Sequence, residues 1–424
     1  MALMRALWMG LGAALCLAAI SCGGGGGGSS GTSSTPPPPP PTNNTVSVIV
    51  DQGPIVNGSP IGSVNTLFTT VTVCVPGSTT NCQTIDHIQV DTQSYGLRFL
   101  ASVLTITLPV ETLPNSSNSL LECTAFLDGF SWGPVATADV QIAGETAKSL
   151  PVQVIGDSRF PTVPANCSGM STGTAEDTVT LFGANGILGI GPFELGCGDC
   201  DTNSHASSAI YYACGTTCVA TVVPTAMQEP NPVTRFAADN NGTIIDLPTV
   251  PSPSTGEATL SGSLIFGIDT QSNNQSGTQT VLTVNDEAEL TMTYNGQPLT
   301  SSFIDSGSNG IFFTDSIVTC AAPPSDPTSG IVDFYCPSNT LTLGLSIQGA
   351  NGVMANNLTF GVGNAITMLD NNQTFSVFPQ LAGTLPAGNA GTFDYGLAFF
   401  YGKRVAVAIE GDTTSVGTGP YIAF

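Results

Sequence analysis

The sequence predicts an all-β protein with two lobes of similar topology, and a repeated stretch is the main reason. Residues 88–104 and 302–318 align without a gap, which places Asp91 opposite Asp305. In each copy an apolar strand leads into an acidic turn, and a second short apolar run follows. Two similar half-chains packed together would bring the two carboxylates face to face.

The rest of the body supports this fold class because its apolar pattern has a period of two. Alternating or β-branched segments are separated by Gly, Asn and Pro, and no helical pattern extends beyond about three turns. A hairpin around a glycine also follows each acidic turn, at residues 140–155 and again at 345–362. The strands expected from this pattern include residues 70–74, 138–142, 151–155, 264–268 and 288–294.

Length and charge limit the functions that the chain can have. Its 424 residues suffice for two lobes with large cores. Thirty acidic residues against seven Lys and Arg give a formal charge of −23. Nucleic acid is therefore excluded as a partner, because its phosphates need basic side chains to neutralise them.

The N-terminus has the pattern of a targeting segment. A basic start and an apolar run over residues 7–20 lead to residues 19–22 (AISC), which resemble a bacterial lipobox. In that motif the cysteine, here Cys22, becomes the lipidated first residue, with plain secretion as the alternative. Residues 1–22 are thus expected to be a lipoprotein signal peptide, and the protein to be anchored in the bacterial cell envelope, at the outer membrane.

Residues 23–44 are expected to be a tether, because they contain six consecutive glycines and six consecutive prolines. The two lobes are then assigned to residues 45–270 and 271–424. The lipid is the only membrane contact expected, since no other segment is long and apolar enough to span a bilayer.

Ten cysteines follow Cys22, and an even number in an exported chain favours disulfides. Short loops suggest the pairs Cys74–Cys82 and Cys320–Cys336, and Cys123 is expected to pair with Cys167. The spacing of the other four would also suit zinc, but an oxidising compartment and the lack of histidine ligands favour disulfides. These four are Cys197, Cys200, Cys214 and Cys218.

The two acidic turns resemble those of pepsin-like aspartic proteases, which carry Asp-Thr/Ser-Gly at the equivalent place. Residues 185–191 and 393–397 resemble the apolar-apolar-Gly segments that cross behind each catalytic loop in that family. Residues 262–269 resemble the strand between the lobes, and 409–424 the closing strands. The resemblance covers about residues 46–424, and with the lipobox it extends to an uncharacterised family of bacterial lipoproteins built on that fold.

This resemblance implies an aspartic endopeptidase that hydrolyses peptide bonds at acid pH, with Asp91 and Asp305 as the catalytic pair. Like charges about 3 Å apart cannot both ionise, so the pair holds one proton. One carboxyl activates a water molecule, the other protonates the substrate carbonyl, and no metal or other cofactor is required. The residues implied to support the catalytic loops are Thr92, Ser94, Ser306, Gly307 and Ser308.

Three departures from the family keep a second function open. Gln93 stands where the family has glycine, and the aromatic residue that supports the flap tyrosine is replaced by Arg98. The tyrosine that the family carries on its flap is also missing, and the aromatic residue nearest to its place is Phe126 or Trp132. The alternative function is that of a catalytically inactive protein that binds peptide, glycan or another protein in the cleft between the lobes.

Overall fold

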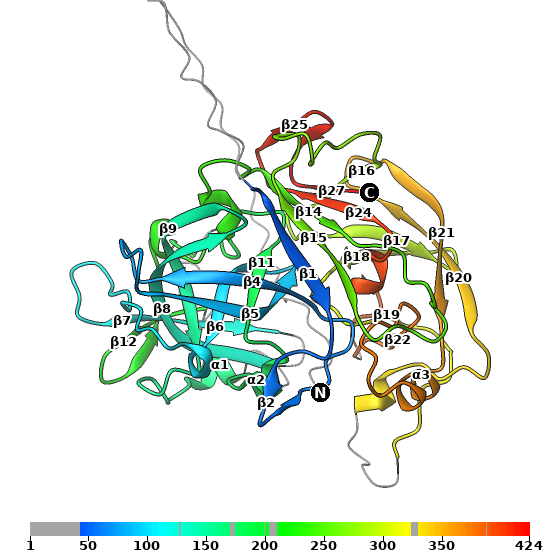
Figure 1. The fold of residues 1–424 in the computed structure, drawn as a ribbon, viewed down its shortest axis with the longest axis horizontal. Helices are drawn as coiled ribbons and strands as arrows, with labels where there is room; N and C mark the ends of the chain where they lie inside the picture. Colours follow the sequence, from blue (N-terminus) through cyan, green and yellow to red (C-terminus); the bar gives the residue numbers. More distant parts are fainter. Residues whose placement is uncertain are drawn as a thin grey trace, which may run out of the picture.

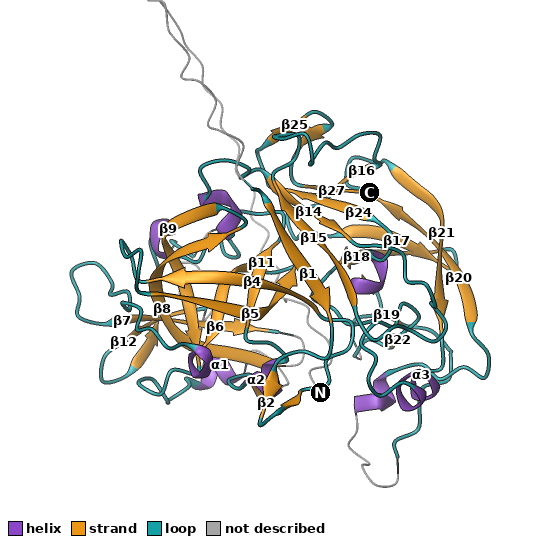
Figure 2. Ribbon diagram, in the orientation of Figure 1, coloured by secondary structure: helices purple, strands orange, loops and turns teal. Residues whose placement is uncertain are grey.

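The computed structural model describes residues 43–126, 129–169, 174–198, 200–202, 210–323, 330–386 and 388–424. Strands dominate these ranges, and helices are few and short (Figure 2). The expected all-β fold class is confirmed. The signal peptide, Cys22 and most of the tether lie outside the described residues. No helix within these ranges is both long enough and apolar enough to cross a membrane.

The helices are single turns or little more, and they lie in the connections between strands. The longest, α3, has seven residues and begins after Asn364, whose side chain accepts a hydrogen bond from the amide of Thr367. The α-helices are α1 (Ala165–Ser168), α2 (Val179–Phe182) and α3 (Ala365–Asn371). The 3₁₀-helices are η1 (Ala101–Val103), η2 (Thr225–Met227), η3 (Pro232–Arg235), η4 (Gly330–Asp333) and η5 (Leu397–Phe399).

The strands gather on two sides of a central group, as Figure 1 shows. The first side is formed by β2 (Ile55–Val56), β3 (Ser59–Pro60), β4 (Leu67–Cys74), β5 (Cys82–Asp91), β6 (Tyr95–Leu100), β7 (Ser119–Ala125), β8 (Gly129–Ile142), β9 (Glu145–Ile155), β10 (Thr174–Ala175), β11 (Gly186–Ile190), β12 (Tyr211–Cys214) and β13 (Cys218–Ala220). The second side is formed by β16 (Val281–Thr283), β17 (Leu290–Tyr294), β18 (Gln297–Ile304), β19 (Ile311–Phe313), β20 (Leu341–Gln348), β21 (Met354–Val362), β22 (Ala382–Gly383) and β23 (Phe393–Tyr395). The central strands are β1 (Thr45–Val50), β14 (Gly242–Asp246), β15 (Leu260–Phe266), β24 (Arg404–Ala408) and β27 (Tyr421–Ala423), and β25 (Thr413–Thr414) pairs with β26 (Gly417–Thr418) at the edge.

Two sheets carry this arrangement. A 16-stranded sheet runs from the first side through the central strands to β16, and a seven-stranded sheet in the order β21-β20-β17-β18-β23-β19-β22 forms most of the second side. One apolar cluster extends through both, because Val90 and Ile304 belong to the same group of buried side chains. The two acidic turns thus begin at the ends of β5 and β18, and side chains of both strands belong to the same core.

The two sides repeat the same crossing of strands. On the first side β11 lies between β5 and β6, parallel to β5 and antiparallel to β6. On the second side β23 lies between β18 and β19, parallel to β18 and antiparallel to β19. The register agrees as well, since Leu188 pairs with Val90 and Tyr395 pairs with Ile304, the residue 214 positions after Val90. The predicted bilobal architecture is therefore built by equivalent pairings in both halves.

Each crossing strand has a glycine at or next to its end that the packing requires: Gly189 lies within β11, and Gly396 directly follows β23. A Cβ on Gly189 would lie 2.5 Å from the backbone nitrogen of Tyr95, and a Cβ on Gly396 would lie 2.2 Å from the backbone oxygen of Gly310. Real Cβ atoms do not approach backbone that closely, so a side chain would force the crossing strand away from the acidic turn. This explains why both apolar segments end in glycine.

The hairpin echo is also confirmed, with one difference. β8 and β9 form one antiparallel hairpin, and β20 and β21 form the other. On the first side β9 itself pairs in parallel with β6. On the second side β19 pairs instead with β22, which follows α3. The inserted segment between β21 and β22 therefore takes over the role that β9 has alone.

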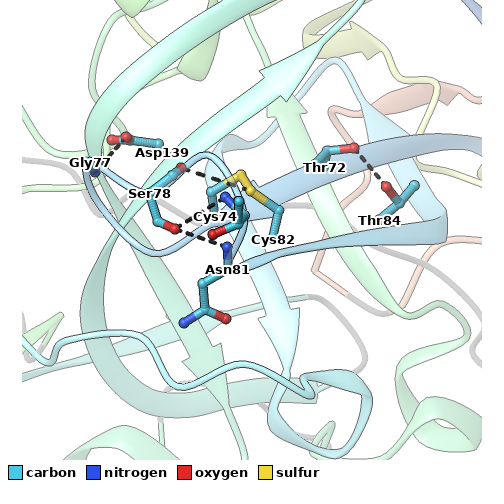
Figure 3. Close-up of a disulfide and its surroundings, with 9 residues drawn as sticks. Thr72, Cys74, Gly77, Ser78, Asn81, Cys82, Thr84 and Asp139 are labelled. Atoms are coloured by element: carbon cyan, nitrogen blue, oxygen red, sulfur yellow. Dashed lines mark hydrogen bonds between the residues drawn. A yellow bond between two sulfur atoms is a disulfide. The ribbon is translucent and has the colours of Figure 1, made fainter.

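All ten cysteines after Cys22 form disulfides, with the pairs Cys74–Cys82, Cys123–Cys167, Cys197–Cys200, Cys214–Cys218 and Cys320–Cys336. Figure 3 shows how Cys74–Cys82 closes the hairpin between β4 and β5. The turn is fixed to β8 as well, because the amide of Gly77 donates a 2.8 Å hydrogen bond to Asp139. The three pairs predicted from spacing are confirmed, and the remaining four cysteines form disulfides as favoured.

The disulfide Cys123–Cys167 is expected to stabilise the fold more than Cys197–Cys200. It closes a loop of 44 residues, against a separation of three residues for the other. Because each disulfide restricts the unfolded chain, it stabilises the folded state, by about 4 kcal/mol for Cys123–Cys167 and about 2 kcal/mol for Cys197–Cys200. Urea unfolding of the two Cys→Ser double variants measures both values. Equal losses would contradict this account of their stabilising effect.

Candidate active site

The two acidic turns place Asp91 and Asp305 at the ends of equivalent strands. Asp91 is the last residue of β5, and Asp305 directly follows β18. Both side chains are withdrawn from solvent, with 3% of Asp91 and 1% of Asp305 exposed. Because the flanking residues Val90 and Ile304 are held in the shared core, the two carboxyls project from a rigid base.

The two carboxyl groups act directly on each other, through their charges and as hydrogen-bonding groups, as expected for an acidic pair that shares a proton. Burial raises the pKa of Asp305 well above its usual range, and the charges of Asp91 and Asp394 raise it further. The structure thus brings together the two residues that the sequence singles out. A pair of this kind holds a proton at pH values where an ordinary aspartate is ionised.

Equivalent backbone amides hold the two carboxyls. Asp91 accepts hydrogen bonds at Oδ1 from the amide of Gln93 at 2.8 Å and from the amide of Ser94 at 3.2 Å. Asp305 accepts one at Oδ1 from the amide of Gly307 at 2.7 Å. In both turns the donor comes from the residue two positions after the aspartate, so the two carboxyls are held in equivalent ways.

The hydroxyls of the two turns cross between the halves. Ser306 Oγ donates to the carbonyl of Val90 at 2.9 Å, and Thr92 Oγ1 donates to the carbonyl of Ile304 at 3.3 Å. Thr92 Oγ1 also accepts from the amide of Ser306 at 3.0 Å. All of these groups are buried, so each bond fixes one turn against the other. Two of the predicted support residues therefore act as the clasp between the turns.

Gly307 allows the close approach of the carboxyls. A Cβ at this position would lie 2.7 Å from Cγ of Asp91 and 2.9 Å from both carboxyl oxygens. The carbonyl of Gly307 is in turn held by the side chain of Gln89 from β5, at 2.8 Å. The glycine of the second turn is thus required by the position of the first carboxyl.

Gln93 occupies the equivalent position in the first turn and breaks the symmetry. Its side-chain amide donates a hydrogen bond to the carbonyl of Ile304 at 3.3 Å, directly beside Asp305. The side chain therefore reaches across to the opposite turn, next to the carboxyl pair. The Gln93 side chain is larger than the glycine found at this position in the family that the chain resembles.

The hydroxyls of Ser94 and Ser308 have different surroundings. Ser308 Oγ lies 3.0 Å from Oδ2 of Asp305 and 2.6 Å from Oδ2 of Asp394 in β23. Ser94 Oγ is buried and makes no hydrogen bond to any described residue. Sequence reasoning missed Asp394, although the signal was present: it interrupts an apolar segment that aligns with residues 186–189, where the corresponding residue is Ile187.

The predicted flap residues are Phe126, which directly follows β7, and Trp132, which lies within β8. Phe126 is buried and packs against Phe182 with ring centroids 6.1 Å apart. Trp132 packs against Tyr212 at 5.1 Å and donates its indole N–H to the carbonyl of Phe160. Both rings are therefore fixed within apolar clusters of the first lobe.

Arg98 fills the position of the missing aromatic residue with a buried charge. Its guanidinium lies 2.9 Å from Glu122 in β7 and 3.4 Å from Glu229, and Nε donates to Thr124 at 3.2 Å. Two carboxyls thus share one buried cation. Burial, together with the charge of Glu122, raises the pKa of Glu229 well above its usual range. This cluster, which joins β6 to the β7–β8 hairpin, could not be predicted from the sequence.

Comparisons with known proteins give one structural neighbour and one family. An aspartic proteinase from Irpex lacteus, known from its crystal structure, superposes with a TM-score of 0.45 and 14% identity over 89% of this chain and 96% of that one. Among curated proteins no sequence matches significantly. The profile of the family described as "Protein of unknown function (DUF3443)" matches residues 40–424. The chain therefore belongs to the DUF3443 family.

Proposed function

We propose that this protein is an aspartic-type endopeptidase that hydrolyses peptide bonds at acid pH. The observation that carries the proposal is the buried, interacting pair of Asp91 and Asp305, held by equivalent amides at two equivalent strand ends. Neither the cross-turn hydroxyl bonds nor Gly307 would be needed for two independent surface turns. Together they support a role that depends on the distance between the carboxyls.

The proposed reaction uses the shared proton of the pair. The ionised carboxyl takes a proton from a water molecule as that water attacks the peptide carbonyl, and the protonated carboxyl donates its proton to the carbonyl oxygen. In the second step the carboxyl that took the proton from water donates it to the amide nitrogen, and the other carboxyl takes a proton from a hydroxyl of the diol. The C–N bond then breaks to give an amine and a carboxylic acid, and the proton of the pair is back on its original carboxyl. Because the pKa of Asp305 is raised, this form persists above the range of an ordinary aspartate and is lost as the pH rises through the raised value.

The test is cleavage of denatured protein substrates between about pH 3 and pH 7 by the purified protein. We expect acidic activity in the parent, and a loss of at least about 1,000-fold in Asp305→Asn, since an amide cannot exchange the proton. Asp286→Asn is the matched control, because Asp286 is exposed. Activity that peaks near neutral pH and survives Asp305→Asn would exclude the carboxyl pair as the catalyst.

Gln93 favours a second candidate function, binding without catalysis. Its side chain reaches the opposite turn beside Asp305, where the family it resembles has only hydrogen. A peptide, glycan or protein ligand would then occupy the cleft between the lobes without being cleaved. An inactive parent in which Gln93→Gly restores acidic cleavage would support this candidate, whereas an active parent little changed by Gln93→Gly would exclude it.

We also propose that the protein acts outside the cytoplasm, attached to the cell envelope by a lipid on Cys22. Five disulfides in the body support an oxidising compartment. Incorporation of labelled fatty acid into the parent, and its absence in Cys22→Ala, is the expected result. A parent recovered from the medium without lipid would instead indicate plain secretion.

A further inference from the structure

Asp394 is a third buried carboxyl next to the pair, at a position where the equivalent strand carries a hydrocarbon. It lies in the middle of β23, with 1% of its side chain exposed. Its counterpart in β11 is Ile187, which is fully buried. An ionisable group in such a place is costly unless it is hydrogen-bonded or protonated. Its contacts therefore indicate what it does.

The contacts of Asp394 pass through one hydroxyl. Ser308 Oγ lies 2.6 Å from Oδ2 of Asp394 and 3.0 Å from Oδ2 of Asp305. A serine hydroxyl has a single proton, and an ionised carboxylate can only accept. Ser308 cannot donate to both carboxyls, so one of the two must carry a proton and donate it to Ser308.

The surroundings indicate that Asp394 is the protonated member. Its other oxygen, Oδ1, is buried and has no hydrogen-bond partner among the described residues. A bare oxygen is tolerable on a neutral acid but costly on a carboxylate. Asp305, in contrast, receives the amide of Gly307 at Oδ1, so the hydroxyl of Ser308 completes its set of donors.

We propose that Asp394 is a positioning residue of the carboxyl pair: it donates its carboxyl proton to Ser308 Oγ, and Ser308 thereby donates its own proton to Asp305. The chain of donors then runs from Asp394 through Ser308 to Asp305. It fixes one orientation of the hydroxyl and gives Asp305 a donor that Asp91 lacks, because Ser94 Oγ makes no hydrogen bond to any described residue. The two carboxyls are thereby made unequal.

The electrostatics agree with this proton order. Burial raises the pKa of Asp394 well above its usual range. A hydrogen bond donated by Ser308 would lower this pKa, and the negative charge of Asp91 raises it, so burial decides the direction. The titratable groups that interact with Asp394 are Asp91 at the end of β5 and Asp305 after β18, both acidic. No described ion pair supplies a cation to Asp394. The proton on Asp394 also keeps the total negative charge beside the pair low.

The effect of the Asp394–Ser308–Asp305 hydrogen bonds on catalysis depends on the proposed function, but the order of the protons along them does not. The first experiment therefore needs no activity: NMR titration of the parent with ¹³C at the Cγ of aspartate, with Asp394→Asn to assign the signal. We expect the Asp394 carboxyl to stay protonated well above the midpoint of ~3.9 of an ordinary aspartate. An Asp394 signal that titrates near that ordinary midpoint would overturn the proposal.

Ser308→Ala tests the direction of the hydrogen bond. If Asp394 donates to Ser308, removing the acceptor destabilises the protonated acid and lowers its titration midpoint. If Ser308 instead donates to an ionised Asp394, the same variant raises the midpoint, and the proposal is wrong. Should Ser308→Ala fail to fold, the parent titration and the activity comparison below still decide.

The activity comparison uses Asp394→Asn and Asp394→Ile. Asparagine keeps an N–H donor towards Ser308, so kcat should stay within about threefold of the parent, whereas isoleucine lacks a donor and should lower kcat by about tenfold or more with little change in KM. Ile187→Val, the equivalent position in β11, is the matched control for a change in strand packing. Equal kcat values in the Asn and Ile variants of an active parent would overturn the proposal. An inactive parent with the expected titration would instead count against the proposed function alone.

Discussion

Gly307→Ala is expected to lower peptidase activity by about 100-fold or more and to destabilise the fold by about 1–3 kcal/mol. The new Cβ would lie 2.7 Å from Cγ of Asp91, a distance that no real Cβ contact shows. The carboxyl of Asp91 is bound to the amides of Gln93 and Ser94 and cannot move aside without breaking these bonds. The two carboxyls must therefore separate, and a shared proton depends on their distance.

Gly344→Ala is the matched control for this variant. Gly344 lies in β20, and the nearest atom to a new Cβ would be the backbone oxygen of Leu358 at 3.7 Å, an ordinary contact. Activity should be unchanged, because nothing near the carboxyl pair is displaced. Cleavage rates on a denatured protein at acid pH and urea unfolding measure both effects. Full activity in Gly307→Ala would mean that this arrangement of the carboxyls is not the reactive one.

Arg98→Met is expected to destabilise the protein by about 3–5 kcal/mol at neutral pH, because it leaves two carboxyls buried without their cation. The loss should be smaller at acid pH. The pKa of Glu229 is already raised in the folded protein, and Arg98 is the group that lowers it, so removing Arg98 raises it further. A folded-state pKa above the unfolded value gives stability that is present at low pH and lost as the pH rises through the folded value.

Arg404→Met provides the comparison with an ordinary surface pair. Arg404 lies 3.1 Å from Asp246, but 30% and 46% of these side chains are exposed. Such exposed pairs contribute about 0–1 kcal/mol to the free energy of unfolding, because both charges remain largely hydrated. Thermal unfolding from about pH 4 to pH 7 should show a growing difference between Arg98→Met and the parent. A constant difference across this range would mean that lost packing, and not unpaired charge, is the cause.

The sequence determined the fold class and the position of the candidate site. The gapless repeat placed Asp91 and Asp305 at equivalent turns, and their position at the strand ends follows from the apolar residues before them. The disulfides Cys74–Cys82 and Cys320–Cys336 could also be predicted, because the turn between each pair is encoded by adjacent residues. Period-two patterns, turn residues and short loops are local, so a single sequence displays them directly.

Only the tertiary structure decided which other charged residues lie next to the carboxyl pair and which lie next to Arg98. Asp394 reaches Ser308 over a sequence separation of 86 residues, and it does so only because β23 is inserted between β18 and β19. Arg98 meets Glu122 and Glu229 because β6, β7 and the chain before η3 converge in one buried region. In the sequence each of these residues is a single charge in a strand or loop and gives no sign of its partner. Strand pairing over long separations is fixed by the packing of the whole core, and a buried carboxyl acquires its proton only from the neighbours which that packing supplies.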